Sequence, residues 1–245
     1  MVLCRPMRFL LLLVAFSFTA TGCYVQTTTP QRDAVAVRSE SRFESEIRAF
    51  EDADRAERPK SGGVVFVGSS SIRLWPDLHA DFPGINVIQR GFGGSRLDEV
   101  LHYTPRIVLA YKPTLIVLYA GDNDLAEGRT PEQIFNDYKA FVATVRKALP
   151  ETRIAYISIK PSGDRWALVD EMRVTNSMIQ AYAARDSKLT YVDVFTSMLG
   201  TDGKPREELF RQDRLHLNDR GYAIWRELLT PIVIGAAAQL PESSH

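Results

Sequence analysis

Short apolar runs alternate with stretches of helical pattern along most of the chain. Five runs rich in Val, Ile, Leu and Tyr have the length and composition of buried strands, at Val64–Val67, Ile85–Ile88, Thr114–Tyr119, Ile154–Ile159 and Leu189–Val194. The stretches around them predict helices at Ser71–Trp75, Leu97–Ala110, Pro131–Ala148, Ala167–Arg185 and Asn218–Ile234. Strands separated by helices predict a parallel sheet wrapped by helices, which is an α/β fold.

The segment before the first strand has two parts. Residues 23–40 contain Thr, Gln and Ser with one Pro and no apolar period, which predicts a flexible tether. From residue 41 to residue 58 apolar side chains recur at the spacing of one helix face, at Phe43, Ile47 and Phe50. An amphipathic helix therefore opens the folded part of the chain. We expect one domain over residues 41–240, because no repeat or second domain is evident.

The extreme N-terminus has the pattern of a secretory signal peptide. Arg5 and Arg8 precede the apolar run Phe9–Phe18, and small residues follow before Cys23. The run is shorter than the roughly 20 residues that a membrane-spanning helix needs. We therefore expect residues 1–22 to be a signal peptide and the protein to be exported.

Cys23 is a candidate site of lipidation. The small residues before it resemble the signal of bacterial lipoproteins, although Ala20 stands where that signal more often has Leu. The resemblance implies a lipid anchor on Cys23 and a place in the bacterial cell envelope, periplasmic or on the outer surface. Cys4 would leave with the signal, so the mature chain would form no intrachain disulfide. The alternative is an ordinary signal peptide with an incidental cysteine.

Composition narrows the classes of function. The chain has 245 residues, of which 45% are hydrophobic and 24% charged, as expected for a globular domain with a tail. Its formal net charge is zero. A general nucleic-acid binder needs a basic stripe to neutralise phosphates, so this class is disfavoured.

Two segments contain the parts of a serine-hydrolase triad. Gly68–Ser71 lies between an expected strand and helix, and Asp213–His216 precedes the last expected helix. A carboxylate three residues before a histidine can accept from Nδ1 and leave Nε2 free as a base. The nucleophile-elbow pattern G-x-S-x-G fails, because Ile72 stands where its second glycine belongs. Taken alone, the serines are explained more simply as a helix cap.

Two glycine-containing turns follow the second and third expected strands, at Gly91–Ser95 and Gly121–Asp124. Glycine lets a backbone approach a ligand, and an Asn such as Asn123 can direct its amide at an oxyanion. Plain turns are the alternative for both. An acidic metal loop is a further alternative for the second, but the spaced oxygen ligands of a calcium loop are missing.

Together these segments resemble the SGNH subgroup of GDSL-type hydrolases, from about Val64 to Tyr222. The family's nucleophile, second-block glycine, third-block asparagine and final D-x-x-H fall on Ser70, Gly94, Asn123, Asp213 and His216. The departures are Ser69, where the name motif has Asp, and Ser71, where it has Leu. Neither position takes part in the chemical steps. The resemblance implies a three-layer α/β/α, flavodoxin-like fold.

The resemblance also implies the activity, that of a serine esterase without metal or cofactor, which the expected anchor at Cys23 would attach to a membrane. Ser70 is the expected nucleophile, His216 its base and Asp213 the partner of the histidine. The N–H groups of Ser70 and Gly94 and the Asn123 amide form the expected oxyanion hole. The implied substrates are short acyl or acetyl esters of lipid or carbohydrate. Acyl transfer to a sugar, and a non-catalytic carbohydrate-binding lipoprotein, are the alternatives.

Several other side chains are candidates for lesser roles. Trp75, Tyr119 and Trp166 are expected either to line a substrate pocket or to pack in the core. The segment Ser158–Trp166 is a candidate for shaping the acyl or sugar side of a site. The remaining histidines lack a comparable neighbour pattern and are expected at the surface, at His79, His102 and His245.

Overall fold

The centre of the protein is a five-stranded, wholly parallel sheet in the order β2-β1-β3-β4-β5. The computed structural model describes Met1 and residues 30–238, so the predicted signal peptide and Cys23 lie outside the described residues. The strands are β1 (Val64–Gly68), β2 (Val87–Gly91), β3 (Leu115–Tyr119), β4 (Arg153–Ile157) and β5 (Leu189–Val192). The chain runs from β1 outward to β2 and then returns past β1 to β3. Ligands of such sheets bind at the carboxyl ends of the strands beside this reversal.

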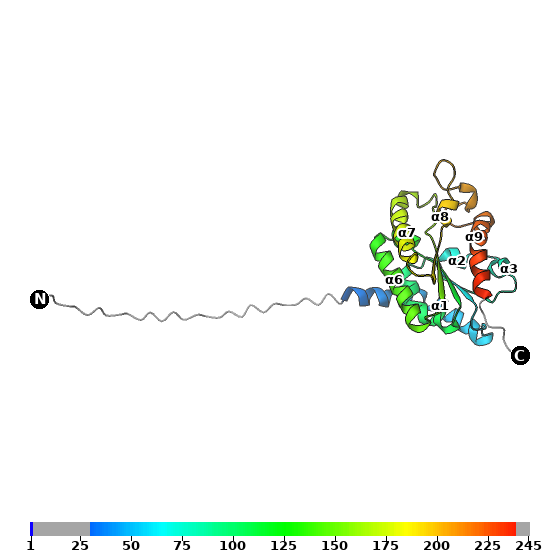
Figure 1. Ribbon diagram of the computed structural model, residues 1–245, viewed down its shortest axis with the longest axis horizontal. Helices are drawn as coiled ribbons and strands as arrows, with labels where there is room; N and C mark the ends of the chain where they lie inside the picture. The colour runs from blue at the N-terminus through cyan, green and yellow to red at the C-terminus, as the bar shows by residue number, and fades with distance from the viewer. Residues whose placement is uncertain (2–29, 239–245) are drawn as a thin grey trace.

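Helices cover both faces of the sheet, which confirms the three-layer prediction (Figure 1). One face packs against α1 (Pro30–Ala56), α4 (Leu97–Ile107), α6 (Pro131–Ala148) and α7 (Val169–Ala183). The other packs against α2 (Ser70–Arg73), α3 (Leu78–Asp81) and α9 (Asp219–Ala237). Neighbouring residues of a strand alternate between the two cores: Val65 and Val67 join the first, whereas Val64 and Phe66 join the second. Every residue of β1 is buried, as both-sided coverage requires.

Apart from α2, which the predicted helix Ser71–Trp75 overlaps, the shortest elements were not predicted as separate elements. They are α5 (Asp122–Ala126), α8 (Val194–Ser197) and the 3₁₀ turns η1 (Leu109–Tyr111), η2 (Trp166–Leu168) and η3 (Glu207–Leu209), together with α3. Elements of three to five residues are too short to show a helical period. The predicted helix Leu97–Ala110 is divided, because α4 ends at Ile107 and η1 follows. No helix within residues 30–238 is long and apolar enough to cross a membrane.

The first helix begins at Pro30 rather than at residue 41. Residues 30–40, which we expected to belong to the tether, are therefore helical. Proline is favoured in the first turn of a helix, and no Gly or Pro interrupts the sequence from there to Pro59. The predicted apolar face is present, since Phe43 and Ile47 are buried in the core.

Candidate active site

The turn after β1 depends on Gly68. Its φ is +142°, and a Cβ at this position would lie 1.8 Å from the carbonyl oxygen of Tyr119 on neighbouring β3. Only glycine fits there. The next N–H, that of Ser69, donates to the same carbonyl oxygen at 3.1 Å. Ser70 then begins α2 at the carboxyl end of β1, where first-turn N–H groups have no partner within the helix.

The three neighbouring serines differ sharply in exposure. Ser69 and Ser71 have exposed fractions of 0% and 1%, and neither Oγ has a hydrogen-bond partner among the described residues. Ser70 is half-buried, and its Oγ lies 3.0 Å from Nε2 of His216. Ser70 is therefore the one serine of this turn that combines an accessible hydroxyl with an adjacent base.

Asp213 holds the histidine from the other side. Its Oδ2 lies 2.7 Å from Nδ1 of His216, and its Oδ1 accepts the N–H groups of Leu215 and His216 at 3.0 and 2.9 Å. Between them Arg214 adopts a left-handed conformation, with φ of +54°, that closes this tight turn. Partial burial opposes ionisation of Asp213, but the hydrogen bonds from His216 and the backbone prevail and lower its pKa to about 2. The carboxylate is thus ionised at ordinary pH and favours the tautomer with a proton on Nδ1.

The loop after β2 carries Gly94 towards the same edge of the sheet. The N–H of Phe92 donates to the carbonyl of Gly68 at 2.9 Å, which ties this loop to the serine turn. Gly94 has φ of +80°, a conformation that favours glycine, and its carbonyl accepts from Nη2 of Arg42 on α1 at 3.2 Å. The predicted glycine therefore lies in a turn fixed on two sides.

Asn123 lies in α5, directly after β3, and is largely buried. Its Nδ2 donates to the carbonyl of Ser95 at 3.0 Å, and its Oδ1 accepts from Nη2 of Arg165 at 2.9 Å. The amide therefore contacts the loop that contains Gly94. All five residues predicted for the triad and the oxyanion hole lie at the carboxyl edge of the sheet, in the turns after β1, β2 and β3 and in the loop before α9.

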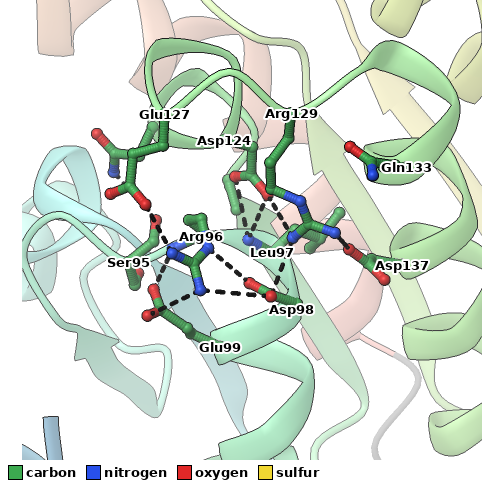
Figure 2. Close-up of polar contacts among 12 residues, drawn as sticks. Ser95, Arg96, Leu97, Asp98, Glu99, Asp124, Glu127, Arg129, Gln133 and Asp137 are labelled. Atoms are coloured by element: carbon green, nitrogen blue, oxygen red, sulfur yellow. Dashed lines mark hydrogen bonds and ion pairs between the residues drawn. The ribbon is translucent and has the colours of Figure 1, made fainter. Parts of the chain in front are cut away.

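A charged network holds the Gly94 and Asn123 turns together (Figure 2). Both carboxylate oxygens of Asp124 accept the N–H of Leu97 at 3.1 Å, at the start of α4, and Nη1 of Arg129 lies 3.3 Å from Asp124 Oδ1. Arg96 forms a second link across the same gap, to Glu127 at 2.6 Å. Asp124 is wholly buried, and this burial raises its pKa to about 7 against the effects of Arg129 and the Leu97 N–H.

Other sequence candidates lie elsewhere. Trp75 and Tyr119 are buried in the core, so the interpretation of these two as pocket residues is wrong. Trp166 is half-buried, whereas His79 and His102 are exposed as predicted. His245 lies outside the described residues. Within residues 30–238 no group of three or more His, Cys, Asp or Glu side chains could hold a metal ion.

Sequence reasoning missed the contact between Arg165 and Asn123. The segment that contains Arg165 was singled out only as a candidate for the substrate side. The signal that could have revealed more is its position after β4, because β4 is the neighbour of β3 and their carboxyl ends meet at one edge.

A family model covers most of the folded part of the chain. The model of the GDSL-like Lipase/Acylhydrolase family matches residues 62–224, a span that begins just before β1 and ends within α9. Among curated proteins, none matches the sequence.

Solved structures share the fold. A GDSL-like lipase from Bacteroides thetaiotaomicron is 23% identical, with a TM-score of 0.66 over 78% of this chain and 98% of its own. A carbohydrate esterase family 3 protein from Talaromyces cellulolyticus is 15% identical, with a TM-score of 0.60 over 74% of this chain and 100% of its own. A lipase/acylhydrolase from Enterococcus faecalis is 18% identical, with a TM-score of 0.54 over 75% and 100% of the two chains. At these identities the likeness concerns the fold alone.

Proposed function

Since this chain belongs to the GDSL-like lipase/acylhydrolase family and is a hydrolase, we propose that it is an exported, lipid-anchored serine esterase. It cleaves carboxylic esters through Ser70, His216 and Asp213. The observation that carries the proposal is the line of contacts from Ser70 Oγ to His216 Nε2, at 3.0 Å, and from His216 Nδ1 to Asp213 Oδ2, at 2.7 Å. Both distances are those of hydrogen bonds. The first allows the Ser70 proton to move to His216, and the second stabilises the positive charge that His216 then carries.

The first half-reaction forms an acyl-enzyme. Ser70 Oγ bonds to the ester carbonyl carbon while its proton moves to Nε2 of His216, and the carbonyl oxygen takes the negative charge. Asp213 keeps the ring oriented and stabilises its positive charge. The tetrahedral intermediate then collapses, the bond to the alcohol oxygen breaks, and the proton on Nε2 goes to that leaving group.

The second half-reaction returns the enzyme. Water gives a proton to His216 Nε2 as its oxygen bonds to the acyl carbon. The second intermediate then collapses: the bond from the acyl carbon to Ser70 Oγ breaks, the proton on Nε2 passes to Oγ, and the carboxylic acid is released. In both halves the oxyanion is stabilised by the N–H groups of Ser70 and Gly94 and by the amide of Asn123. The turns after β1, β2 and β3 each supply one of these donors.

The substrate class proposed is a short acyl or acetyl ester of a lipid or carbohydrate. The test is a screen of p-nitrophenyl esters from acetate to long acyl chains, run beside acetylated sugars. We expect kcat/KM to be highest for the shortest acyl groups and to vanish in Ser70→Ala. Adding a free sugar and analysing products separates hydrolysis from acyl transfer, because only transfer yields a newly acylated sugar. A purified, folded protein inactive on every ester would contradict the proposal.

Activity should rise with pH through a single ionisation. His216 must be neutral to accept the Ser70 proton, so its protonation in acid removes the base and lowers kcat/KM. Asp213 cannot cause this rise of kcat/KM with pH, because its pKa is lowered to about 2 and it stays ionised at higher pH. The measurement is a profile of kcat/KM against pH.

The control for this profile is Asp124→Asn. Asp124 is a titratable group near the site whose pKa is raised to about 7 by burial. An asparagine can still accept the N–H of Leu97 but does not titrate. The ascending limb should remain in this variant. Its disappearance would assign the ionisation to Asp124 and contradict the role given to His216.

Membrane attachment should depend on Cys23. One acyl chain binds a membrane only marginally, whereas the several chains of a bacterial lipoprotein anchor it stably. We expect Cys23→Ser to move the protein from the membrane fraction to the soluble fraction with its specific activity unchanged. The measurement is fractionation followed by an esterase assay of each fraction. Retention of the variant in the membrane would contradict the proposed anchor.

A further inference from the structure

The carboxamide of Asn123 has a hydrogen-bond acceptor beside its nitrogen and a hydrogen-bond donor beside its oxygen. Its Nδ2 donates to the carbonyl oxygen of Ser95 at 3.0 Å, and its Oδ1 accepts from Nη2 of Arg165 at 2.9 Å. The oxygen and nitrogen of a carboxamide have nearly the same shape, so sterics alone do not choose between two orientations related by a flip. The partners do choose. After a flip, the amide donors would face a guanidinium, which cannot accept, and the oxygen would face a carbonyl oxygen.

We propose that Arg165 is a positioning residue of the esterase site, which locks the Asn123 carboxamide with its nitrogen towards the reacting carbonyl. The inference rests on the proposed function, because it gives Asn123 the role of an oxyanion donor. Ser95 takes one of the two amide protons, and the second is the donor to the oxyanion. Without Arg165, one of the two contacts that select this orientation is lost.

Arg165 is itself fixed by a buried ion cluster under the site. Its Nη1 lies 3.2 Å from Oδ2 of Asp122, and Nζ of Lys160 donates to the same oxygen at 2.9 Å. Lys160 also donates to the hydroxyl of Tyr119 at 3.1 Å. Lys160 is 1% exposed, so it does not line the substrate side as a solvent-facing charge.

Two cations on one carboxylate keep that carboxylate charged. Burial works against ionisation of Asp122, but Lys160 and Arg165 hold its pKa below the usual value. Asp122 is 4% exposed. Its charge therefore pulls the guanidinium of Arg165 inward with little screening by water. Because Asp122 and Asn123 are adjacent in α5, the same helix turn that carries the amide also anchors the residue that orients it.

The alternative role for Arg165 is purely structural, as the partner of a buried carboxylate. The two roles predict different dependences of the Arg165 substitution on the residue at position 123. If Arg165 is purely structural, replacing it lowers the stability of the protein whichever residue occupies position 123. A positioning residue loses its effect on turnover once the amide that it orients is gone.

The experiment is a double-mutant cycle of Arg165→Met and Asn123→Ala, with kcat, KM and Tm measured for each protein. We expect Arg165→Met to lower kcat by about 10- to 100-fold and to change KM by less than about twofold, less than the loss of the donor itself. In the Asn123→Ala background the same change should cost less than about threefold. Equal losses of kcat in both backgrounds, or a kcat near that of the wild type in Arg165→Met, would overturn the inference.

Arg146→Met is the matched control. Arg146 has a similarly buried side chain, 22% exposed against 15% for Arg165. It binds the backbone carbonyl of Thr152 and the carboxylate of Asp186, which match in kind the neutral amide oxygen and the carboxylate that Arg165 binds. These partners precede β4 and β5, so they lie at the amino ends of the strands, away from the carboxyl ends that carry the candidate site. Its variant should lose thermal stability without losing kcat. If Arg165→Met does not fold, Arg165→Lys keeps a cation beside Asp122 and is put through the same cycle with the same criterion.

A second measurement does not depend on turnover. In Ser70→Ala, the side-chain amide resonances of Asn123 are identified by their loss on the further change Asn123→Ala. Removing Arg165 should shift these resonances, and unmoved resonances would overturn the inference. If instead the wild type hydrolyses no ester and a fluorophosphonate does not label Ser70, the proposed function fails. The resonances still decide whether Arg165 orients the amide.

Discussion

Replacing Ser70 with alanine should abolish ester hydrolysis, with a loss of about 10⁴–10⁶ in kcat, as expected when the nucleophile of a triad is removed. The reason is that no neighbouring hydroxyl can substitute. Ser69 and Ser71 are buried, with exposed fractions of 0% and 1%, and His216 Nε2 contacts Ser70. The fold should survive, because the change removes one oxygen from a half-buried side chain.

The matched controls are Ser69→Ala and Ser71→Ala, the same substitution one residue to either side. Each removes a buried hydroxyl that has no hydrogen-bond partner among the described residues. Loss of an unpaired polar atom costs little and can stabilise. Both variants should therefore keep near wild-type activity and Tm. A fluorophosphonate probe, followed by mass spectrometry of the labelled peptide, should modify Ser70 alone. Labelling of Ser69 or Ser71 would contradict the assignment of the nucleophile.

Elements whose signals are local in the sequence were predicted closely. The helix Pro131–Ala148 has the predicted bounds, because its start is encoded in the segment itself. The Thr130 hydroxyl accepts the N–H of Gln133, and the Gln133 side-chain oxygen accepts the N–H of Thr130. Strand β3, predicted from Thr114, begins one residue later at Leu115. The sequence signals for both sets of bounds lie within the segments themselves.

Strand β2 shows why other bounds were wrong. We predicted Ile85–Ile88, whereas the strand runs from Val87 to Gly91 and includes Arg90. A charged side chain argues against a buried strand when the sequence alone is considered. Here it is tolerated because Arg90 pairs with Asp54 of α1 and with the hydroxyl of Tyr111. These partners are distant in the sequence, so no local pattern could reveal them.

In the candidate site, too, contacts between residues close in the sequence were predictable and contacts between distant segments were not. Asp213 and His216 form one local turn, and their pairing was predictable from spacing. The contact of Arg165 with Asn123 was not, because it joins segments that follow two different strands, α5 after β3 and the loop after β4. The sequence placed Lys160 and Arg165 together in one candidate segment. The structure separates their roles: Lys160 is enclosed beside Asp122, while Arg165 reaches the amide.

Replacing Asn123 with alanine should lower kcat by about 10²–10³, or roughly 3–4 kcal/mol, with little change in KM. A donor directed at charge that develops only in the transition state contributes to kcat and scarcely to substrate binding. The same change also removes the hydrogen bonds to Ser95 and Arg165. A hydrogen bond contributes about 1 kcal/mol to stability. The fall in Tm should therefore be modest, and the loss of turnover in the folded protein much the larger effect.

Asn123→Asp tests the loss of turnover separately from the loss of stability. A carboxylate at this position keeps an acceptor for Arg165 and gains an opposite charge beside it, so the fold should be at least as well supported on that side. It presents no N–H to the substrate and repels the oxyanion, so kcat should fall at least as far as in Asn123→Ala. A folded Asn123→Asp protein that turns over normally would contradict the role of oxyanion donor. So would an Asn123→Ala protein that melts early but whose folded fraction retains full kcat, because the residue would then serve only to build the turn after β3.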